Sequence, residues 1–477
     1  MTGGWNVVYL STVLLFTTII FLIFKALRNP LRHIPGPWHS LVTSYPLKLD
    51  VLKGRRLHHI HRLHLKYGPI VRVGPTELAV ADIDAYKIIY RAGLAGFQKD
   101  DWYFGLTDFP IKAVFNMSDN KEHATRRRML APGFTKTNIV REWQPVVQEN
   151  TKLAMRQMHV SATALFGESF EMLMAGERNQ YIRDLEKVMM WGGLGYEFPM
   201  LRFISQHLPP LPFEVTLQLS SAAKTISQYG QKAVAASRLT NTLTRNVFKT
   251  MIADAEKGLP SLTDLDVSVE AGNLQIAGTD TTANTLTFLV WAVAKRPEIQ
   301  LRLAQEVAVV REEELNDVRL SQLPFLDAVI QETLRLYPAV GSSLLRVVPR
   351  GGADLCGYAI PEGTTVGTTA YTIHRLSSVW GPDAEKFRPE RWLEYAEKGI
   401  SGVSDEAKAA FNPFGGGSRS CLGLHLAMME LRIAVAMFYR EFKVSMKVAE
   451  ETTDESMEME DYFVIAPKGH TCVLVAT

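Results

Sequence analysis

The chain has few cysteines, little net charge and no repeated or low-complexity segment. Three cysteines in 477 residues do not form a disulfide framework, so a packed core must hold the fold together. Such sparing use fits a reducing compartment, where a cysteine is a buried apolar residue, a catalytic group or a metal ligand. A net charge of +2 gives no sign of a general nucleic-acid binder. Apolar residues make up 47% of the chain, as in an ordinary globular protein with a substantial core.

The N-terminal segment Trp5–Phe24 contains no charged side chain, and most of its residues are bulky and apolar. A helix of this length, at about 1.5 Å per residue, is about 30 Å long and matches the hydrocarbon core of a bilayer. Lys25 and Arg28 follow at once, so the positive-inside rule places the rest of the chain in the cytosol. The alternative is a cleaved signal peptide, but no basic segment precedes the run and no small-residue cleavage site follows it. We therefore expect residues 1–32 to form an uncleaved membrane anchor with one transmembrane helix.

The segment Pro35-Gly36-Pro37 cannot continue a helix and predicts a stiff break after the anchor. No linker interrupts the remainder, so residues 33–477 are expected to form one large domain. The patterns in this domain are mostly helical, and the expected helices are Arg55–Tyr67, Asp119–Leu130, Asp264–Lys295, Pro297–Glu313, Leu326–Tyr337 and Leu422–Phe442.

Short strands are expected between these helices, at Ile70–Val73, Glu77–Val80, Leu344–Val348, Gly357–Ile360 and Thr365–Thr369. The turn Pro361–Gly363 predicts that the last two strands form a hairpin. The acidic run Glu450–Asp461 near the C-terminus is typical of a solvated loop.

A glycine-rich segment, Phe414–Gly423, places Cys421 just before a strongly apolar helical pattern. Its small residues allow the backbone to approach a flat partner closely. At the start of a helix, free N–H groups and the positive end of the helix dipole stabilise a thiolate, and Arg419 adds a positive charge nearby. Taken alone, the segment indicates either a stabilised thiolate that binds a metal or acts as a nucleophile, or a buried core cysteine in a turn.

Two further patterns are ambiguous by themselves. Glu332 and Arg335 have the i, i+3 spacing of an ion pair on one helix face, which is most often a weak surface pair. The run Ala277–Thr282 puts glycine and several threonines inside an expected helix, where they are poor helix formers. Such small residues leave room for a diatomic ligand beside an acid and an alcohol, or they serve a contact between two helices.

The spacing of Phe414, Gly417, Arg419, Cys421 and Gly423 resembles the haem-binding signature of the cytochrome P450 family at every fixed position. The resemblance implies the P450 fold, which is mainly α with small β-sheets, preceded here by the expected membrane helix. It implies that Cys421 is the axial ligand of the iron of haem b, where a thiolate favours O–O cleavage. By the same resemblance, Arg419 binds a haem propionate and Phe414 packs near the sulfur.

Other motifs follow in the order that this family shows. Glu332 and Arg335, joined by Arg391 from the segment Phe387–Trp392, resemble its structural Glu-x-x-Arg network; Trp392 stands where phenylalanine is commoner. On the central helix, Asp280 and Thr281 correspond to the acid–alcohol pair that delivers protons for oxygen activation, and Gly278 borders the oxygen groove. The residues implied to contact the propionates are His123, Arg127 and Arg346. Arg126 and Arg128 should then point away from the haem and offer a basic patch to an acidic redox partner.

The resemblance implies a monooxygenase that inserts one oxygen atom from O2 into a lipophilic small molecule. Electrons would come from NADPH through NADPH–cytochrome P450 reductase, with cytochrome b5 as a further donor, at the endoplasmic reticulum membrane. The chain looks most like fungal members that tailor secondary metabolites. Its expected substrate-contacting segments are Phe97–Phe115, Trp191–Leu211, Leu274–Ala277, Val340–Leu344 and Tyr462–Val464.

Two other classes remain as alternatives to a monooxygenase. One is a haem-thiolate isomerase or dehydratase that needs no reductase, and the other is a non-catalytic haem-binding protein. Neither class needs a proton relay, so the pair Asp280–Thr281 favours the monooxygenase.

Overall fold

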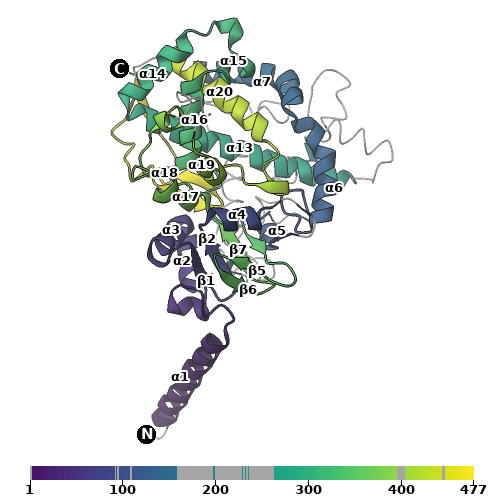
Figure 1. The fold of residues 1–477 in the computed structure, drawn as a ribbon, viewed down its shortest axis with the longest axis vertical. Helices are drawn as coiled ribbons and strands as arrows, with labels where there is room; N and C mark the ends of the chain where they lie inside the picture. The colour runs from purple at the N-terminus through teal and green to yellow at the C-terminus, as the bar shows by residue number, and fades with distance from the viewer. Residues whose placement is uncertain are drawn as a thin grey trace.

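The computed structural model describes residues 3–91, 93, 96–107, 110–157, 197–198, 228, 231–232, 235, 263–394, 403–442 and 446–476. The side chains of residues 3–8, 10–12, 15, 156–157 and 476 are also outside the description. In Figure 1 the labelled strands lie on the side of the body from which the first helix projects, and long helices make up most of the other side. This part of the chain is mostly helical with small sheets, as predicted.

The helices that frame the site are of very different lengths. Those with eight or more residues are α1 (Gly3–Arg28), α2 (Tyr45–Leu52), α3 (Arg56–Tyr67), α6 (Asn120–Leu130), α7 (Lys136–Gln157), α13 (Asp264–Ala294), α14 (Pro297–Ala308), α16 (Pro324–Leu336) and α20 (Leu424–Phe442). The shorter ones are α4 (Ile83–Ile89), α5 (Trp102–Thr107), α15 (Asp317–Leu320), α17 (Ala370–Ile373), α18 (Ser377–Trp380) and α19 (Asp405–Ala410). Each predicted helix is therefore present, with ends that differ by a few residues.

The strands are short and lie in four separate sheets among the described residues. They are β1 (Ile70–Gly74), β2 (Glu77–Val80), β3 (Gln98–Lys99), β4 (Arg346–Val347), β5 (Ala353–Leu355), β6 (Tyr358–Ile360), β7 (Thr365–Thr368), β8 (Met446–Val448), β9 (Met459–Tyr462), β10 (Val464–Pro467) and β11 (Leu474–Ala476). The largest sheet has the order β1-β2-β7-β4-β3, and its β3–β4 pairing sets Lys99 directly opposite Arg346.

The predicted hairpin of β6 and β7 is wrong. β6 pairs with β5, whereas β7 pairs in parallel with β2 on one edge and antiparallel with β4 on the other. Three of the four residues of β7 are buried, so this strand belongs in the interior of a larger sheet. The turn Pro361–Gly363 therefore connects two different sheets.

The acidic run near the C-terminus is not wholly a solvated loop. Its last residues form β9, which pairs with β10 and alternates between buried and partly buried positions. Asp461, the last acid of the run, is only 2% exposed. The prediction of a solvated loop was wrong for these residues because a run of charges does not show that its end forms a strand. In a strand, alternate side chains face opposite sides, and here that alternation turns the Asp461 carboxylate inward.

The helices that carry the site begin at clear capping signals. The Asp119 side chain accepts hydrogen bonds from the backbone N–H groups of Lys121 and Glu122 at the start of α6. Thr263 and Asp266 form a reciprocal capping box at the start of α13. These caps fix where α6 and α13 enter the body.

The core holds α13 and α20 in fixed positions. α20 packs against α7, α14, α13 and α16, and buried residues from these helices, such as Trp143, Phe288, Leu326, Met429 and Ile433, form one continuous cluster. In Figure 1, α13 crosses the middle of the body. A close-packed core of this kind is stiff, so it sets the distance between α13 and the start of α20.

The first helix, α1, extends away from the body (Figure 1). Its described side chains include a run of exposed apolar residues, with Phe16 66%, Ile20 54% and Phe24 50% exposed. Within the described residues, no helix qualifies as a membrane-spanning segment. The transmembrane helix expected for Trp5–Phe24 is thus not supported by that result.

Candidate active site

Cys421 lies in a tight turn between a short 3₁₀ helix, Gly417–Arg419, and α20. Its backbone N–H donates to the Phe414 carbonyl at 2.8 Å and so closes the loop. Gly415 and Gly417 have φ angles of 68° and 64°, in the left-handed region that glycine adopts at little cost. The glycines predicted to allow a close backbone approach are therefore also the residues that shape the turn.

The sulfur of Cys421 faces a cavity, which leaves the side chain accessible even though it lies deep in the protein. Burial raises the pKa of the Cys421 thiol, and the Gly423 N–H, Arg127 and the Leu424 N–H offset only part of that rise. The nearby charge comes from Arg127, not from Arg419 as expected from the sequence. The start of α20 thus does not hold the thiol ionised by itself, whereas a metal cation bound to the sulfur would.

The cavity has a volume of about 290 Å³ and brings together segments that are far apart in the sequence. Most of the site residues predicted from the sequence line it, namely His123, Arg127, Gly278, Thr281, Arg346, Phe414, Arg419 and Cys421. The expected substrate-contacting segments contribute Tyr103, Phe115, Leu274, Ala277, Val340, Leu344, Phe463 and Val464. The segment Trp191–Leu211 lies outside the described residues except for Glu197 and Phe198.

One wall of the cavity gathers basic side chains from three elements. His123 and Arg127 come from α6, Arg346 from β4, and Arg419 precedes the cysteine. Arg419 donates to the carbonyls of Met117 (2.6 Å) and Ser118 (2.9 Å), while its buried Nε has no hydrogen-bond partner among the described residues. Arg127 likewise donates to the Ser420 carbonyl at 2.8 Å.

The basic wall is electrostatically frustrated, because its cations bond neutral carbonyls and repel one another. Burial, followed by the charges of Arg419 and Arg127, lowers the pKa of His123 to about 3. Burial and Arg346 lower the pKa of Arg419 to about 10. An anion with two carboxylates would relieve this repulsion and pair the unused donors. The donor set thus fits the two propionates of a haem whose iron lies at Cys421.

Lys99 belongs to the same wall, and the sequence analysis missed it. It is 9% exposed, its Nζ donates to the Phe115 carbonyl, and the same atom lies 3.9 Å from the ring centre of Tyr103. Burial, Arg346 and then Arg419 hold its pKa well below the usual value for lysine. Like charges directly opposite in a sheet are unfavourable, so the register of Lys99 with Arg346 again calls for an anion. Lys99 can be assigned to the basic wall only from that register, which depends on the tertiary structure and not on the local sequence.

The opposite wall is the middle of α13, where Ala277, Gly278, Thr281 and Thr282 line the cavity. The Thr281 hydroxyl donates to the Ala277 carbonyl at 2.9 Å, as expected for threonine inside a helix. α13 nevertheless continues unbroken from Asp264 to Ala294. Asp280 is partly buried and does not appear among the described residues that line the cavity. The structure therefore places only the alcohol of the predicted acid–alcohol pair on the wall.

A carboxyl group on α20 was also missed. Glu430 lines the cavity and accepts a hydrogen bond from the Thr282 hydroxyl at 3.2 Å. Burial raises the pKa of Glu430 to about 7, and the bond from Thr282 opposes that rise. A lone glutamate within the apolar helical pattern Leu424–Phe438 was the sequence signal that would have identified it.

Glu332, Arg335 and Arg391 lie together but away from the cavity. Glu332 accepts from Arg335 at 2.8 and 2.9 Å and from Arg391 Nε at 3.0 Å. The indole N–H of Trp392, the residue that departs from the commoner phenylalanine, donates to Glu332 at 3.0 Å. Burial raises the pKa of Glu332, but the two arginines outweigh it and leave the pKa below its usual value. The trio ties α16 to the short helix Pro389–Trp392.

Arg126 does not form the exposed basic patch expected beside the site. It pairs with Asp266 at 2.6 Å and with Glu270 at 3.4 Å, both on α13. Arg128 is exposed, as is Lys121 on the same helix. The basic surface of α6 is thus formed by Arg128 and Lys121, while Arg126 fixes α6 against α13.

Comparison with known proteins agrees with this geometry. The cytochrome P450 family model matches residues 35–473. The chain is 37% identical to cytochrome P450 monooxygenase stcB of Emericella nidulans, over 94% of this chain and 89% of that protein. It is 36% identical to cytochrome P450 monooxygenase tazI of Aspergillus terreus, over 97% of both chains. It is 34% identical to cytochrome P450 monooxygenase aflV of Aspergillus parasiticus, over 96% of this chain and 93% of that protein.

Proposed function

The chain belongs to the cytochrome P450 family, and from that premise we propose that Cys421 is the ligand of the haem iron in a monooxygenase that oxidises a lipophilic small molecule. The observation that carries this proposal is the cavity itself. Among the described residues, it combines one thiol, a wall of basic side chains with which no carboxylate pairs, and a wall of small residues and threonines on α13.

Each wall has a distinct task in this proposal. Arg127, Arg346 and Arg419, with His123 and Lys99, hold the two propionates by charge-assisted hydrogen bonds. Phe414 packs beside the cysteine turn, and Gly278 keeps the opposite wall open. When bound, the haem supplies the activation of dioxygen and the transfer of one oxygen atom.

Proton delivery is assigned to α13. Thr281 carries its hydroxyl on the cavity wall, within a hydrogen bond of the Ala277 carbonyl, and is placed to pass a proton into the cavity. Asp280, next in the chain, is the proposed source that exchanges protons with the solvent side of α13. The apolar remainder of the lining excludes water from the reacting atoms.

The substrate class follows from the rest of the lining. Leu274, Val340, Leu344 and Val464 are aliphatic, and Tyr103, Phe115 and Phe463 are aromatic. Such a surface favours a lipophilic molecule with ring character. We place the reaction among the tailoring steps of fungal secondary metabolism, because the similar monooxygenases named above come from Emericella and Aspergillus species.

A P450 monooxygenase receives its electrons from a redox partner, and we propose NADPH–cytochrome P450 reductase, with cytochrome b5 as a further donor. Exposed Lys121 and Arg128 on α6 support docking of an acidic protein near the propionate side of the cavity. The exposed apolar side chains of α1 support attachment to the endoplasmic reticulum membrane, with the body in the cytosol.

The central claim is tested by Cys421→Ala in the full chain. Wild-type protein, reduced and treated with carbon monoxide, should show the red-shifted Soret band of thiolate ligation, and the variant should lack it. Cys356→Ala and Cys472→Ala, at the two other free thiols, are matched controls that should keep the band. A band that survives Cys421→Ala would refute the assignment.

A further inference from the structure

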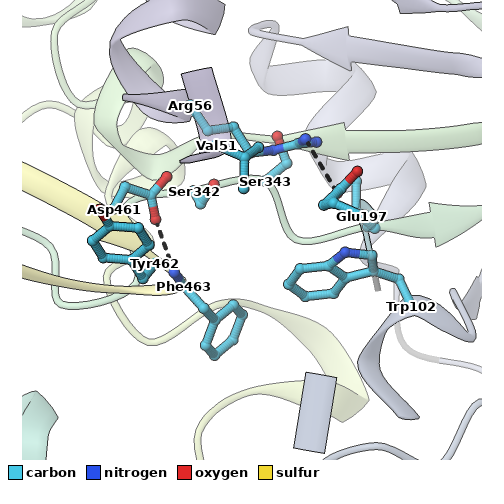
Figure 2. A pocket seen from close by; sticks show the side chains of 10 residues that line it. Val51, Arg56, Trp102, Glu197, Ser342, Ser343, Asp461, Tyr462 and Phe463 are labelled. Atoms are coloured by element: carbon cyan, nitrogen blue, oxygen red, sulfur yellow. Dashed lines mark hydrogen bonds and ion pairs between the residues drawn. The ribbon is translucent and has the colours of Figure 1, made fainter. Parts of the chain in front are cut away.

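A second, smaller cavity, here called the polar pocket, adjoins the cavity above Cys421. Its volume is about 30 Å³, and the residues that matter here are Val51, Arg56, Ser342, Asp461 and Phe463 (Figure 2). Phe463 lines both cavities. The polar pocket is therefore reached from the larger cavity past the Phe463 ring.

Phe463 stands at the tip of the β9–β10 hairpin, between the paired residues Tyr462 and Val464. Its φ angle is 92°, a left-handed conformation that is strained for a bulky residue and occurs where surrounding structure enforces it. Figure 2 shows the enforcing contact, a hydrogen bond of 3.1 Å from the Phe463 N–H to Asp461 Oδ1. Asp461 thus fixes the residue that separates the two cavities.

The side of Phe463 toward the larger cavity is aromatic. Its ring centre lies 5.4 Å from that of Phe115 and 6.1 Å from that of Tyr103, with the rings near perpendicular. Trp102, 5.9 Å from Phe463, is a further ring and lines the polar pocket. A flat, apolar molecule would be in contact with these rings over much of its length.

The other carboxylate oxygen of Asp461 is unused. Asp461 is 2% exposed, and within the described residues its Oδ2 has no hydrogen-bond partner. Burial raises the pKa of Asp461, and the Phe463 N–H, Arg56 and the Ser342 hydroxyl, which also interacts with this carboxylate, compensate only in part. A buried acceptor without a donor is costly, so this oxygen indicates a ligand group or a water.

The charges around the polar pocket favour a hydrogen-bond donor. Among the described residues that line it, Arg56 is the cation, and Glu197 and Asp461 are the carboxylates. The Arg56 guanidinium already pairs with Glu77 and lies 3.8 Å from Glu197. A second full cation would meet Arg56, whereas a neutral hydroxyl would not. A volume of about 30 Å³ accommodates one hydroxyl or one water.

We propose that Asp461 is a specificity-determining residue that accepts a hydrogen bond from a hydroxyl at the far end of an otherwise apolar, ring-bearing substrate. The proposal rests on the proposed function, since it takes the near end of that substrate to lie above Cys421. Recognition by a buried acceptor discriminates strongly, because a substrate without the donor leaves Asp461 Oδ2 unpaired.

The test uses haem-loaded full-length protein and iron-coordinating probes. Phenyl-, biphenyl- and terphenyl-imidazoles are compared with a terminal hydrogen, hydroxyl or methoxy group, and binding is followed by the Soret shift of nitrogen ligation. For at least one tail length, the hydroxyl probe should bind wild-type protein about tenfold more tightly than its methoxy analogue.

Two variants distinguish the contribution of the Asp461 carboxylate from that of the space in the polar pocket. Asp461→Asn keeps an oxygen for the Phe463 N–H but puts a donor nitrogen in place of Oδ2, so the preference for hydroxyl over methoxy should disappear. Val51→Leu adds one methylene to the pocket wall without touching the carboxylate, and it should remove the same preference while the unsubstituted probe still binds. Asp405→Asn, the same change at an exposed site, should keep the wild-type ratio.

The outcomes are distinguishable. If wild-type protein binds the hydroxyl and methoxy probes with equal affinity at every tail length, the proposal is wrong and the pocket holds only water. A preference that survives Asp461→Asn would overturn the role of Asp461. Absence of any thiolate-type Soret band would overturn the proposed function, and the subsite with it.

Discussion

Thr281 contributes a single hydroxyl to the wall opposite Cys421, and that group defines a prediction. In Thr281→Ala, the haem should remain bound while product formed per NADPH falls by about tenfold or more, because a proton-donating group is lost. The electrons should appear as hydrogen peroxide. Measuring NADPH, peroxide and product in parallel checks this balance.

Thr287→Ala is the matched control for that experiment. Thr287 lies on the same helix, bonds the Ala283 carbonyl at 2.9 Å, and does not appear among the described residues that line the cavity. Its removal should leave the coupling unchanged. Equal coupling in wild type and Thr281→Ala would show that α13 delivers protons without this hydroxyl.

We expect Glu430 to make the stability of the protein depend on pH. Its pKa is raised to about 7 in the folded chain from an ordinary value of 4.5, so the folded state holds a proton that the unfolded state releases. Stability should therefore fall as pH rises from about 4.5 to about 7, by at most about 3 kcal/mol. Glu430→Gln keeps an acceptor for Thr282 and should remove this slope.

Urea unfolding followed by circular dichroism at pH 5.5 and pH 8 measures that slope. The free energy of unfolding of Glu430→Gln, relative to that of wild type, should increase as pH rises. Identical slopes for both proteins would mean that Glu430 does not titrate in this range.

Local sequence identifies some of these residues and not others. Cys421 and Arg419 are found because the turn that presents them is encoded by their immediate neighbours. Lys99 and Asp461 take their roles from a strand register and a pleat, which involve residues far away in the sequence. The motif predicted that Asp280 and Thr281 act together, but only Thr281 appears among the described residues that line the cavity. Adjacent side chains on a helix point in different directions, so a shared motif does not place both at one wall.

At the scale of elements, α16 and the short helix Pro389–Trp392 are joined by the buried trio of Glu332, Arg335 and Arg391. All three are at most 5% exposed. In Glu332→Gln, Arg335 would lose its paired carboxylate in the interior, and Arg391 would keep only Asp383, at 3.4 Å. The free energy of unfolding should then fall by about 3–5 kcal/mol, with poor retention of haem.

Glu390→Gln provides the control for that change. Glu390 belongs to the same short helix and pairs at 3.5 Å with Arg302 on the surface. Its loss should cost no more than about 1 kcal/mol. If both variants unfold at the same urea concentration, the buried trio does not support the fold.

The elements also show where pattern reasoning works. Long helices such as α13 and α20 have periodic or continuous apolar patterns over many residues, and the capping box of α13 is local. The pairing of strands cannot be predicted in this way, because the sequences of β6 and β7 do not show whether the two strands form a hairpin or pair with other strands. The error at Pro361–Gly363 arose because pairing is decided by β2 and β4, which lie elsewhere in the chain.

At the scale of the whole molecule, the junction of α1 with the body determines how the chain can be divided. Asn29 donates to the carbonyls of Leu41 (2.9 Å) and Pro75 (3.0 Å), and Leu31 is 1% exposed. These residues belong to the packed body although the sequence analysis put them in the anchor segment. A truncation that preserves folding therefore begins at Asn29.

Removing residues 1–28 tests whether α1 holds the protein at the membrane. The truncated protein should keep its Soret band, because none of the described side chains of α1 lines the cavity above Cys421. It should also pass from the pellet to the supernatant when host membranes are extracted at high salt. A full-length variant with Phe16→Lys and Ile20→Lys should behave in the same way, since each lysine costs about 2.5–3.5 kcal/mol at the centre of a bilayer. If both proteins stay in the pellet, the body carries its own membrane-binding surface, and attachment through α1 is refuted.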